Sequence, residues 1–385
     1  MTQGIGGLYR SQEMCIRDRH GGYFMKKRIV LTGGGTAGHV TPNIALVPYL
    51  LRDGWEIHYL GTEEGIERKL IEQVEGVAYH PIQSGRFRRY FTWKNFTDPF
   101  KVIRGMGQSK RILRDLKPRV LFSKGGFVSV PVVFGAKSAG VPVVLHESDY
   151  TAGLANKLSA PKASVICTSF DPKELGIAGD KAVWTGSPIR DEITHGNAAR
   201  ARTALGFDQK PVLLFLGGSQ GSAAVNAALE EALGAILMEY NVIHVRGKGN
   251  LNPSLTQQGY KQFEYVDAEL ADYFALCDLM IGRAGANTIF ELLCLMKPSV
   301  LIPLPKEVSR GDQILNARYF QSMNYGVMLE QKDLTPKSLI SAIHDVYRRR
   351  GEMAAAMEKS PIKNGTINVL RQIYRAANLP FPFEG

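Results

Sequence analysis

The chain has 385 residues, which is enough for two domains of ordinary size. Its 44% hydrophobic and 22% charged residues are typical of a soluble globular protein and argue against a disordered or fibrous one. The net charge of +11 favours anionic partners, and no uninterrupted apolar run reaches the length of a transmembrane helix. The four cysteines are scattered without disulfide or metal spacing, which fits a reducing cytoplasm.

In chain order, residues 1–24 have no periodicity and no apolar signal-peptide segment, so we expect a disordered or non-native leader. The regular pattern begins at Met25. We predict an N-terminal domain at 25–188 and a C-terminal domain at 189–361. Residues 362–385 follow as an amphipathic helix whose parent domain the pattern does not assign, and packing back on the N-terminal domain is one option.

Strand and helix patterns alternate from Met25 onward, which predicts an α/β fold with parallel sheets covered on both faces. The strands expected in the first half are 28–32, 56–60, 78–82, 120–123, 141–146, 165–168 and 182–185. The alternation restarts after residue 205 at a second glycine-rich loop. The strands expected there are 212–216, 242–246, 263–266, 279–281 and 299–302. The two halves therefore predict two similar domains, each beginning with a strand, a glycine loop and a helix.

The first glycine loop lies in residues 31–42, which read LTGGGTAGHVTP. We expect a helix at 43–51, with Thr41 as its N-cap and Pro42 in its first turn. A helix start behind a glycine loop favours an anionic or hydroxyl-rich ligand. The loop lacks the Gly-Lys-Ser/Thr of a P-loop, and the dinucleotide-binding spacing lacks its usual acid after the next strand. His39 is either a helix-capping residue or a general base.

A strongly basic segment spans residues 86–119, with eleven Lys or Arg against two Asp, a net charge of +9. Three interpretations are open: a solvated helix face, a nucleic-acid site, or a surface for an anionic membrane. We favour the membrane because exposed aromatic side chains need an apolar environment. The residues assigned to that surface are Arg86, Phe87, Arg88, Arg89, Phe91, Trp93, Lys94 and Phe96.

The second half contains a denser set of polar residues at strand ends. Residues 282–288 follow a strand and open a helix that carries Glu291, so phosphates can face the helix start and Glu291 can bind a vicinal diol. Arg190 is a natural counter-charge for a diphosphate. Gln313 and Asn316 follow on the next helix. Each has an ordinary structural explanation alone, but together they predict a site for a uridine-diphosphate sugar.

These motifs resemble the MurG family of UDP-N-acetylglucosamine transferases of peptidoglycan synthesis, and the resemblance extends from Met25 to the C-terminal helix. It is carried by residues 34–39, 146–149 with 153–157, 186–190, 217–221, 283–291 and 312–317. The resemblance implies a GT-B architecture, in which two Rossmann-like domains face each other across a cleft. It also implies inverting transfer of GlcNAc from UDP-GlcNAc to the 4-hydroxyl of the MurNAc of lipid I, forming lipid II.

The resemblance further implies roles for single residues. His39 and Glu147 are the rival candidates for the general base. The substrate-binding residues that it implies are Thr36, Ala37, Gly38, Asp149, Asn156, Arg190, Ser219, Gln220, Val266, Ala286, Asn287, Thr288, Glu291, Gln313 and Asn316. We expect no essential metal or cofactor, because no Asp-x-Asp pair is placed to hold a metal.

The expected location is the cytoplasmic face of the cell membrane, peripherally attached to its anionic surface. Other cell-wall synthesis and division proteins are further expected partners, and nucleic acid is not. Three alternatives stay open: a glycosyltransferase that acts on diacylglycerol, a UDP-sugar 2-epimerase of the same architecture, and a non-catalytic nucleic-acid-binding protein. The last would leave both glycine loops and the residues around Glu291 without a use.

Overall fold

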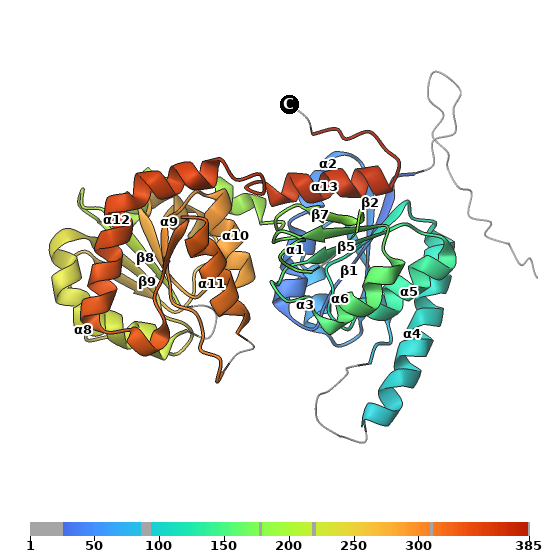
Figure 1. Ribbon diagram of the computed structural model, residues 1–385, viewed down its shortest axis with the longest axis horizontal. Helices are drawn as coiled ribbons and strands as arrows, with labels where there is room; N and C mark the ends of the chain where they lie inside the picture. The colour runs from blue at the N-terminus through green and yellow to red at the C-terminus, as the bar shows by residue number, and fades with distance from the viewer. Residues whose placement is uncertain (1–25, 86–93, 177–178, 218–220, 309–310, 384–385) are drawn as a thin grey trace, which may run out of the picture.

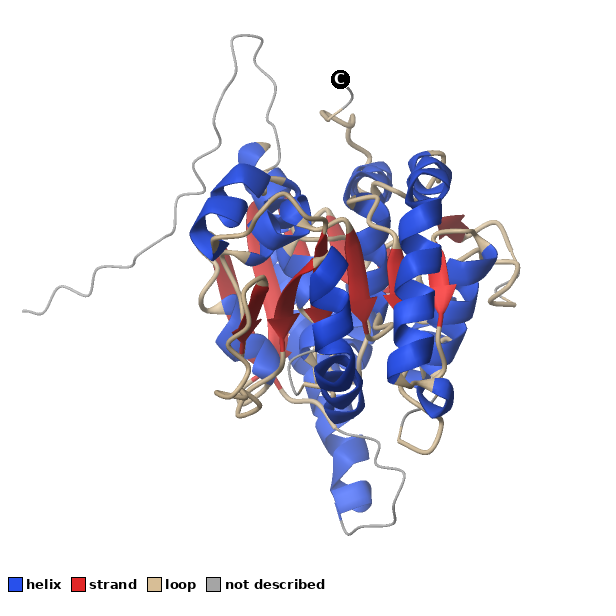
Figure 2. Cartoon of the chain, turned by 90° about the vertical axis from the view of Figure 1, so that its left-hand side faces the viewer, coloured by secondary structure: helices blue, strands red, loops and turns tan. Residues whose placement is uncertain are grey.

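The computed structural model of the chain describes residues 26–85, 94–176, 179–217, 221–308 and 311–383. Within these residues the strands form one parallel sheet of seven strands and one of six, each with helices on both faces (Figures 1 and 2). In spatial order the first sheet contains β3 (Val77–Ile82), β2 (Glu56–Thr62), β1 (Arg28–Thr32), β4 (Val120–Ser123), β5 (Val143–Glu147), β6 (Val165–Thr168) and β7 (Ala182–Trp184).

The second sheet repeats the same winding. Its spatial order is β10 (Tyr260–Phe263), β9 (Asn241–Val245), β8 (Val212–Leu216), β11 (Leu279–Gly282), β12 (Ser299–Leu301) and β13 (Gly326–Met328). In both sheets the first strand of the half lies in the middle and the chain then changes direction. The loops at that switch point, after β1 and β4 and after β8 and β11, are where open parallel sheets bind ligands.

Helices connect successive strands. In the first half they are η1 (Ala37–His39), α1 (Thr41–Ile44), α2 (Val47–Arg52), α3 (Ile66–Ile71), α4 (Lys94–Leu116), α5 (Ser129–Ala139), α6 (Leu154–Ser159) and η2 (Ala160–Lys162). The others are η3 (Asp191–Thr194), α7 (Ala198–Leu205), α8 (Ala223–Glu239), α9 (Leu270–Leu276), α10 (Ala286–Cys294), α11 (Asp312–Ser322), η4 (Gln331–Asp333), α12 (Pro336–Glu358) and α13 (Gly365–Ala376).

Two local predictions were wrong. The strand expected at 263–266 is β10, which ends at Phe263; its residues alternate between buried and exposed positions, so it lacks the apolar run of a fully buried strand. The helix expected at 43–51 is divided into α1 and α2, and Thr41 lies inside α1 instead of capping it. The hydroxyl of Thr41 donates to the Ala37 carbonyl at 3.1 Å, because η1 already occupies the expected cap position.

The chain crosses between the two sheets twice, and the crossings are bonded to each other. The Thr366 hydroxyl accepts from the Ile189 N–H at 3.1 Å and donates to the Ile189 carbonyl at 3.2 Å. A Cβ at Gly365 would overlap the Ser187 backbone, so only glycine allows this approach. Beyond the second crossing, α13 packs Leu370 and Ile373 into the core around β1 and lies on the N-terminal half (Figure 1).

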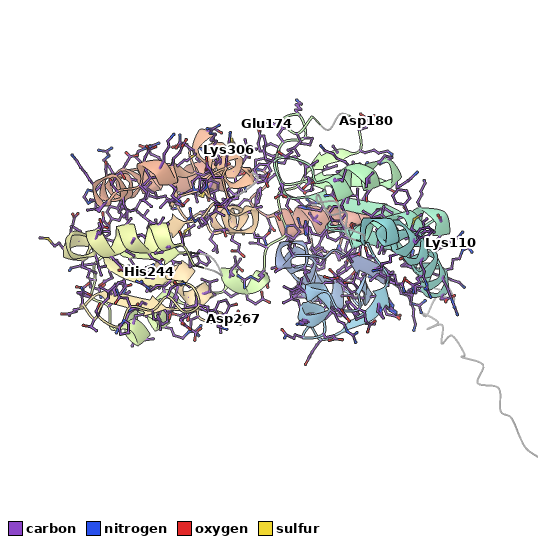
Figure 3. All side chains as sticks on the ribbon, turned by 90° about the horizontal axis from the view of Figure 1, so that it is seen from below. Lys110, Glu174, Asp180, His244, Asp267 and Lys306 are labelled. Carbon is purple, nitrogen blue, oxygen red and sulfur yellow. The ribbon has the colours of Figure 1, made fainter. Side chains whose placement is uncertain are left out.

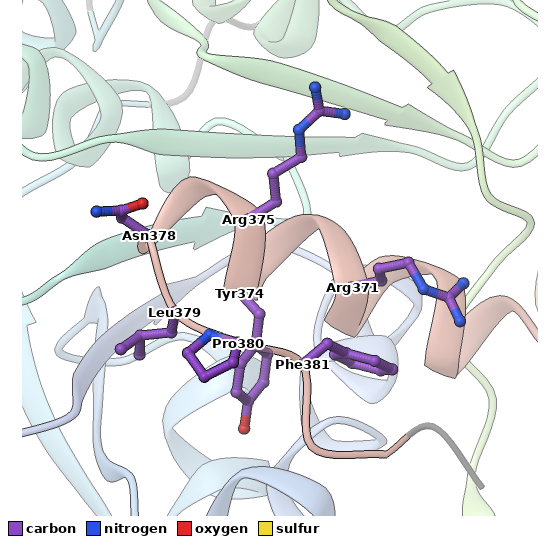
Figure 4. A pocket seen from close by; sticks show the side chains of 7 residues that line it. All are labelled: Arg371, Tyr374, Arg375, Asn378, Leu379, Pro380 and Phe381. Atoms are coloured by element: carbon purple, nitrogen blue, oxygen red, sulfur yellow. The ribbon is translucent and has the colours of Figure 1, made fainter.

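The residues after α13 fold back along that helix (Figure 4). The Phe381 ring packs edge-on against Tyr374 at 5.5 Å, and Phe383 packs against Tyr49 at 5.7 Å. The Tyr49 hydroxyl in turn donates to the Asp191 carboxylate at 2.7 Å. The end of the chain therefore contacts the same tyrosine that holds the first crossing segment.

Candidate functional site

The first glycine loop follows β1 at the switch point of the first sheet. A Cβ at Gly33 would overlap the His39 carbonyl oxygen, and Gly35 has a φ of 85°. Glycine is therefore required both for close approach and for the left-handed backbone. Thr36, Ala37 and Gly38 are exposed beyond it, and His39 is half-buried. The His39 Nδ1 is hydrogen-bonded to the Thr36 hydroxyl at 2.9 Å, which orients the imidazole on the loop.

A buried acid that the sequence did not reveal supports this loop. Glu67 of α3 is 0% exposed and accepts from the Gly35 N–H at 3.2 Å and the Thr62 N–H at 3.1 Å. The Thr62 hydroxyl donates to the same carboxylate. Its neighbours read I-E-R-K-L-I, a pattern equally typical of a solvated helix acid, so no signal in the sequence identifies it. Glu67 joins the loops after β1 and β2.

Glu147, the last residue of β5, has a similar arrangement. It is 4% exposed, and its oxygens accept from the Asp149 N–H at 3.0 Å, the Gly153 N–H at 3.1 Å and the Asn156 amide at 2.8 Å. Burial raises the pKa of the Glu147 carboxyl. The structure thus brings together three residues that the sequence singled out, Glu147, Asp149 and Asn156, around one carboxylate.

Lys124 lies beside this group and was not predicted. It directly follows β4 and is 1% exposed, and its Nζ donates to the His146 Nδ1 at 2.8 Å. The other imidazole nitrogen, Nε2, donates to the Gly186 carbonyl at 2.9 Å. Burial lowers the pKa of Lys124 to about 8, while the Glu147 and Asp149 carboxylates act in the opposite direction.

In the second half, the structure brings Arg190 and Glu291 together from the crossing segment and from α10. The Arg190 Nη2 donates to Glu291 Oε1 at 3.4 Å, and the buried Arg190 Nε has no hydrogen-bond partner among the described residues. Burial raises the pKa of Glu291, and Arg190 partly opposes that shift. Helix α10 begins after Gly285 without a side-chain cap, so the N–H groups of its first turn, at Ala286, Asn287 and Thr288, are not taken up by a capping side chain.

Cationic and amide side chains hold the loops around α10 by binding carbonyl groups. The Arg283 guanidinium donates to the Ile302 carbonyl at 3.0 Å and to the Ser222 hydroxyl at 2.7 Å. Asn316 was predicted as a sugar contact, but it is buried and its amide donates to the Ala284 carbonyl at 3.0 Å. Gln313, half-buried, accepts from the Leu304 N–H at 3.0 Å.

Val266 is buried in the loop after β10. The next residue, Asp267, lies on the side of the second half that faces the first (Figure 3). Ser219 and Gln220 lie outside the described residues, as does the basic and aromatic segment from Arg86 to Trp93. Lys94 and Phe96 belong to the first turns of α4, whose backbone alone is described there.

Two searches of the structure found nothing. In the described residues, no three or more His, Cys, Asp or Glu side chains gather so that they could hold a metal ion. Over the same stretches of chain, no helix combines the length and hydropathy needed to cross a bilayer.

The sequence matches the two domains of one enzyme family. The glycosyltransferase family 28 N-terminal domain matches residues 29–168, and the C-terminal domain of that family matches residues 212–372. A UDP-N-acetylglucosamine–N-acetylmuramyl-(pentapeptide) pyrophosphoryl-undecaprenol N-acetylglucosamine transferase from Geobacillus thermodenitrificans is 52% identical, over 87% of this chain and 95% of its own. A relative of the same name from Clostridium botulinum is 51% identical, over 90% and 98%.

Solved structures agree with these matches. The crystal structure of MurG from Acinetobacter baumannii superposes with a TM-score of 0.72 at 25% identity, covering 91% of this chain and 99% of that one. A calicheamicin glycosyltransferase, 15% identical with a TM-score of 0.67, shares the fold over 92% of this chain and 99% of its own. This chain is therefore a glycosyltransferase that belongs to family 28 and, within that family, to the MurG enzymes.

Proposed function

We propose that this enzyme transfers GlcNAc from UDP-GlcNAc to the 4-hydroxyl of the MurNAc of lipid I, with inversion at the sugar, and so forms lipid II. Relatives that carry the corresponding transferase name are 51–52% identical over most of the chain. The observation that carries the proposal is the pairing of Arg190 with Glu291 beside the uncapped start of α10. This group of residues has the chemistry to bind a nucleoside diphosphate.

The donor occupies the second half in this proposal. The diphosphate accepts from the first-turn N–H groups at Ala286, Asn287 and Thr288, with Ser219 and Gln220 on the neighbouring loop. The Arg190 Nε, buried without a partner among the described residues, gains an anionic acceptor there. Glu291 binds the ribose hydroxyls. The backbone of Val266 pairs with uracil, and Gln313 contacts the sugar while Asn316 holds the loop beside it.

The acceptor occupies the first half, at the loops after β1 and β5. The acceptor hydroxyl oxygen attacks the anomeric carbon, the bond from that carbon to UDP breaks, and its electron pair passes to the β-phosphate oxygen. We assign His39 as the base that takes the hydroxyl proton. Glu147 is the weaker candidate, because its buried oxygens already accept from three donors.

Arg190 and the α10 start supply positive potential where the leaving group develops negative charge. Because these protein groups match that charge, we expect turnover to continue in the presence of a chelator. A purified assay with and without EDTA tests this point, and complete loss of turnover on chelation would contradict it.

We further propose that the enzyme docks peripherally on the anionic cytoplasmic face of the membrane. Helix α4 projects from the first half at its amino-terminal end (Figure 1). There it exposes Phe100 and Ile103 beside Lys101 and Arg104, directly after the basic and aromatic segment. Apolar side chains next to cations suit the headgroup region of an anionic bilayer. The other proteins of cell-wall synthesis and division are proposed partners at this surface.

The decisive assay follows labelled GlcNAc from UDP-GlcNAc to a short-chain lipid I analogue. Diacylglycerol and an acceptor-free reaction run in parallel. We expect transfer to the lipid I analogue alone. Transfer to diacylglycerol would identify a glycolipid-forming enzyme, and consumption of UDP-GlcNAc without acceptor would identify an epimerase, so either result would reject the proposal.

A further inference from the structure

The mechanism above leaves one buried charge at the switch point without a role. The Lys124 backbone N–H donates to the Thr32 carbonyl at 2.9 Å, which extends the pairing of β1 and β4 to the point where their loops separate. A lysine at this edge would ordinarily reach into solvent. The side chain of Lys124 instead points inward and lies among the ends of the strands.

The hydrogen bonds of Lys124 do not neutralise its charge. A carbonyl oxygen can only accept, so the His146 Nε2 that contacts Gly186 carries the hydrogen and the Nδ1 accepts from Lys124. The imidazole is therefore neutral, in agreement with a pKa that burial and the Lys124 charge both hold well below the usual value. The ammonium is bonded to a neutral acceptor inside the protein.

The opposite charges lie next to that contact. The acidic groups that face Lys124 are Glu147 of β5, Asp149 of the following loop and, more weakly, the Cys167 thiol of β6. The Glu147 carboxylate collects two backbone N–H groups and the Asn156 amide, as described above. An ionised acceptor forms stronger hydrogen bonds than a protonated one, so the loop is held most firmly when Glu147 carries its charge.

Stability alone gives no reason for a lysine at this position. Taking an ammonium out of water costs several kcal/mol, and apolar replacements of buried ion pairs are often neutral or stabilising. A methionine would fill similar volume without that cost. The charge therefore has a use beyond packing, and the neighbouring carboxylate of Glu147 is the group that needs it.

We propose that Lys124 is a positioning residue for the transfer reaction: its buried ammonium keeps Glu147 ionised and thereby holds residues 147–156 in the shape that receives the acceptor. This inference rests on the proposed function, in which lipid I binds to the first half. Lys124 itself does not touch the substrate and acts through Glu147 and His146.

The test is a Lys124→Met variant of the full chain, assayed with UDP-GlcNAc and the short-chain lipid I analogue. We expect the KM for the acceptor to rise roughly tenfold, as for the loss of one charge-assisted interaction, while the KM for UDP-GlcNAc stays within about twofold. The melting temperature should be unchanged or higher. Lys337→Met, which removes an exposed lysine from the start of α12, is the matched control and should alter neither KM.

Two further measurements separate charge balance from packing. Amide hydrogen exchange of residues 148–156 should be faster in Lys124→Met, with residues 283–291 unchanged. Adding Asp149→Asn to Lys124→Met removes one of the two acids, so the double variant should have a lower acceptor KM than the two single effects combined predict.

Several outcomes would overturn the inference. One is a wild-type acceptor KM in Lys124→Met, and another is a parallel rise of both KM values. Faster exchange throughout the chain together with a lower melting temperature would assign Lys124 a structural role only. If the wild-type enzyme fails to use lipid I, the proposed function fails instead, and an unchanged exchange rate at 148–156 in the variant would still refute the role of Lys124.

Discussion

The two halves share one sheet winding but stabilise their ligand-facing loops in opposite ways. In the first half, the buried carboxylates of Glu67 and Glu147 collect backbone N–H groups from the loops after β1, β2 and β5. In the second half, the side chains of Arg283 and Asn316 collect backbone carbonyls around β11, β12 and α10. The same fold thus uses up donors on one side and acceptors on the other.

This difference explains a division of labour. Where acids have already taken the N–H groups, a loop has little left to offer a diphosphate, and the exposed His39 loop suits a hydroxyl acceptor instead. Where carbonyls are taken by cations and amides, the N–H groups of α10 stay available for an anion. We therefore expect the donor diphosphate in the second half and the proton acceptor in the first.

The largest expected effect comes from His39→Ala. Loss of a general base typically lowers kcat by about a hundred- to ten-thousandfold, and we expect this variant to fall in that range with little change in the KM for UDP-GlcNAc. Steady-state kinetics measure the split. His344→Ala, at an exposed histidine of α12, is the control. A His39→Ala enzyme with near-normal kcat would remove the base from the first half.

Glu291→Gln should come next and should affect the other substrate. It removes a charged partner of Arg190 and of the ribose, so the KM for UDP-GlcNAc should rise by roughly thirtyfold while the acceptor KM is retained. Glu358→Gln, an exposed acid at the end of α12, should behave as wild type. A rise confined to the acceptor KM would reverse the assignment of the two halves.

Glu67→Gln tests whether a buried acid organises the first glycine loop. The amide has one acceptor oxygen for donors that now bind two carboxylate oxygens, so we expect kcat to fall by about tenfold and the melting temperature to drop. The exposed neighbour Glu64→Gln is the control for charge. Unchanged kcat in Glu67→Gln would mean that the loop keeps its shape without the carboxylate.

The smallest effect concerns pH and Lys124. Because its folded pKa of about 8 lies below the unfolded value of 10.5, the unfolded chain binds more protons between these values, and wild-type stability rises with pH in that window. The Lys124→Met variant lacks this term. From pH 7 to 9 the wild type should gain about 1 kcal/mol relative to the variant in urea unfolding. A constant difference would show that the lysine does not titrate there.

Part of this arrangement was predictable from the sequence. Strands β1, β4, β6 and β8 have the predicted bounds, because strands buried on both faces are continuous apolar runs. The divided helix after His39 and the three-residue β13 depend on local geometry that such runs do not record. Motifs located His39 and Glu291 directly.

The supporting residues were hidden for a physical reason. Glu67 and Lys124 are buried by loops that lie far away along the chain, and their immediate neighbours resemble those of a surface acid and a loop lysine. Asn316 shows the converse, since its motif pointed to the sugar while its amide in the structure donates to the Ala284 carbonyl. Burial decides the role of a polar residue, and burial is a property of the whole fold.

The most direct test of the division between the halves is a crystal structure of the enzyme with UDP-GlcNAc. We predict the diphosphate at the N–H groups of Ala286, Asn287 and Thr288 with Arg190 beside it, and the ribose hydroxyls on Glu291. A diphosphate bound instead in the loop that follows β1, next to His39, would contradict the account.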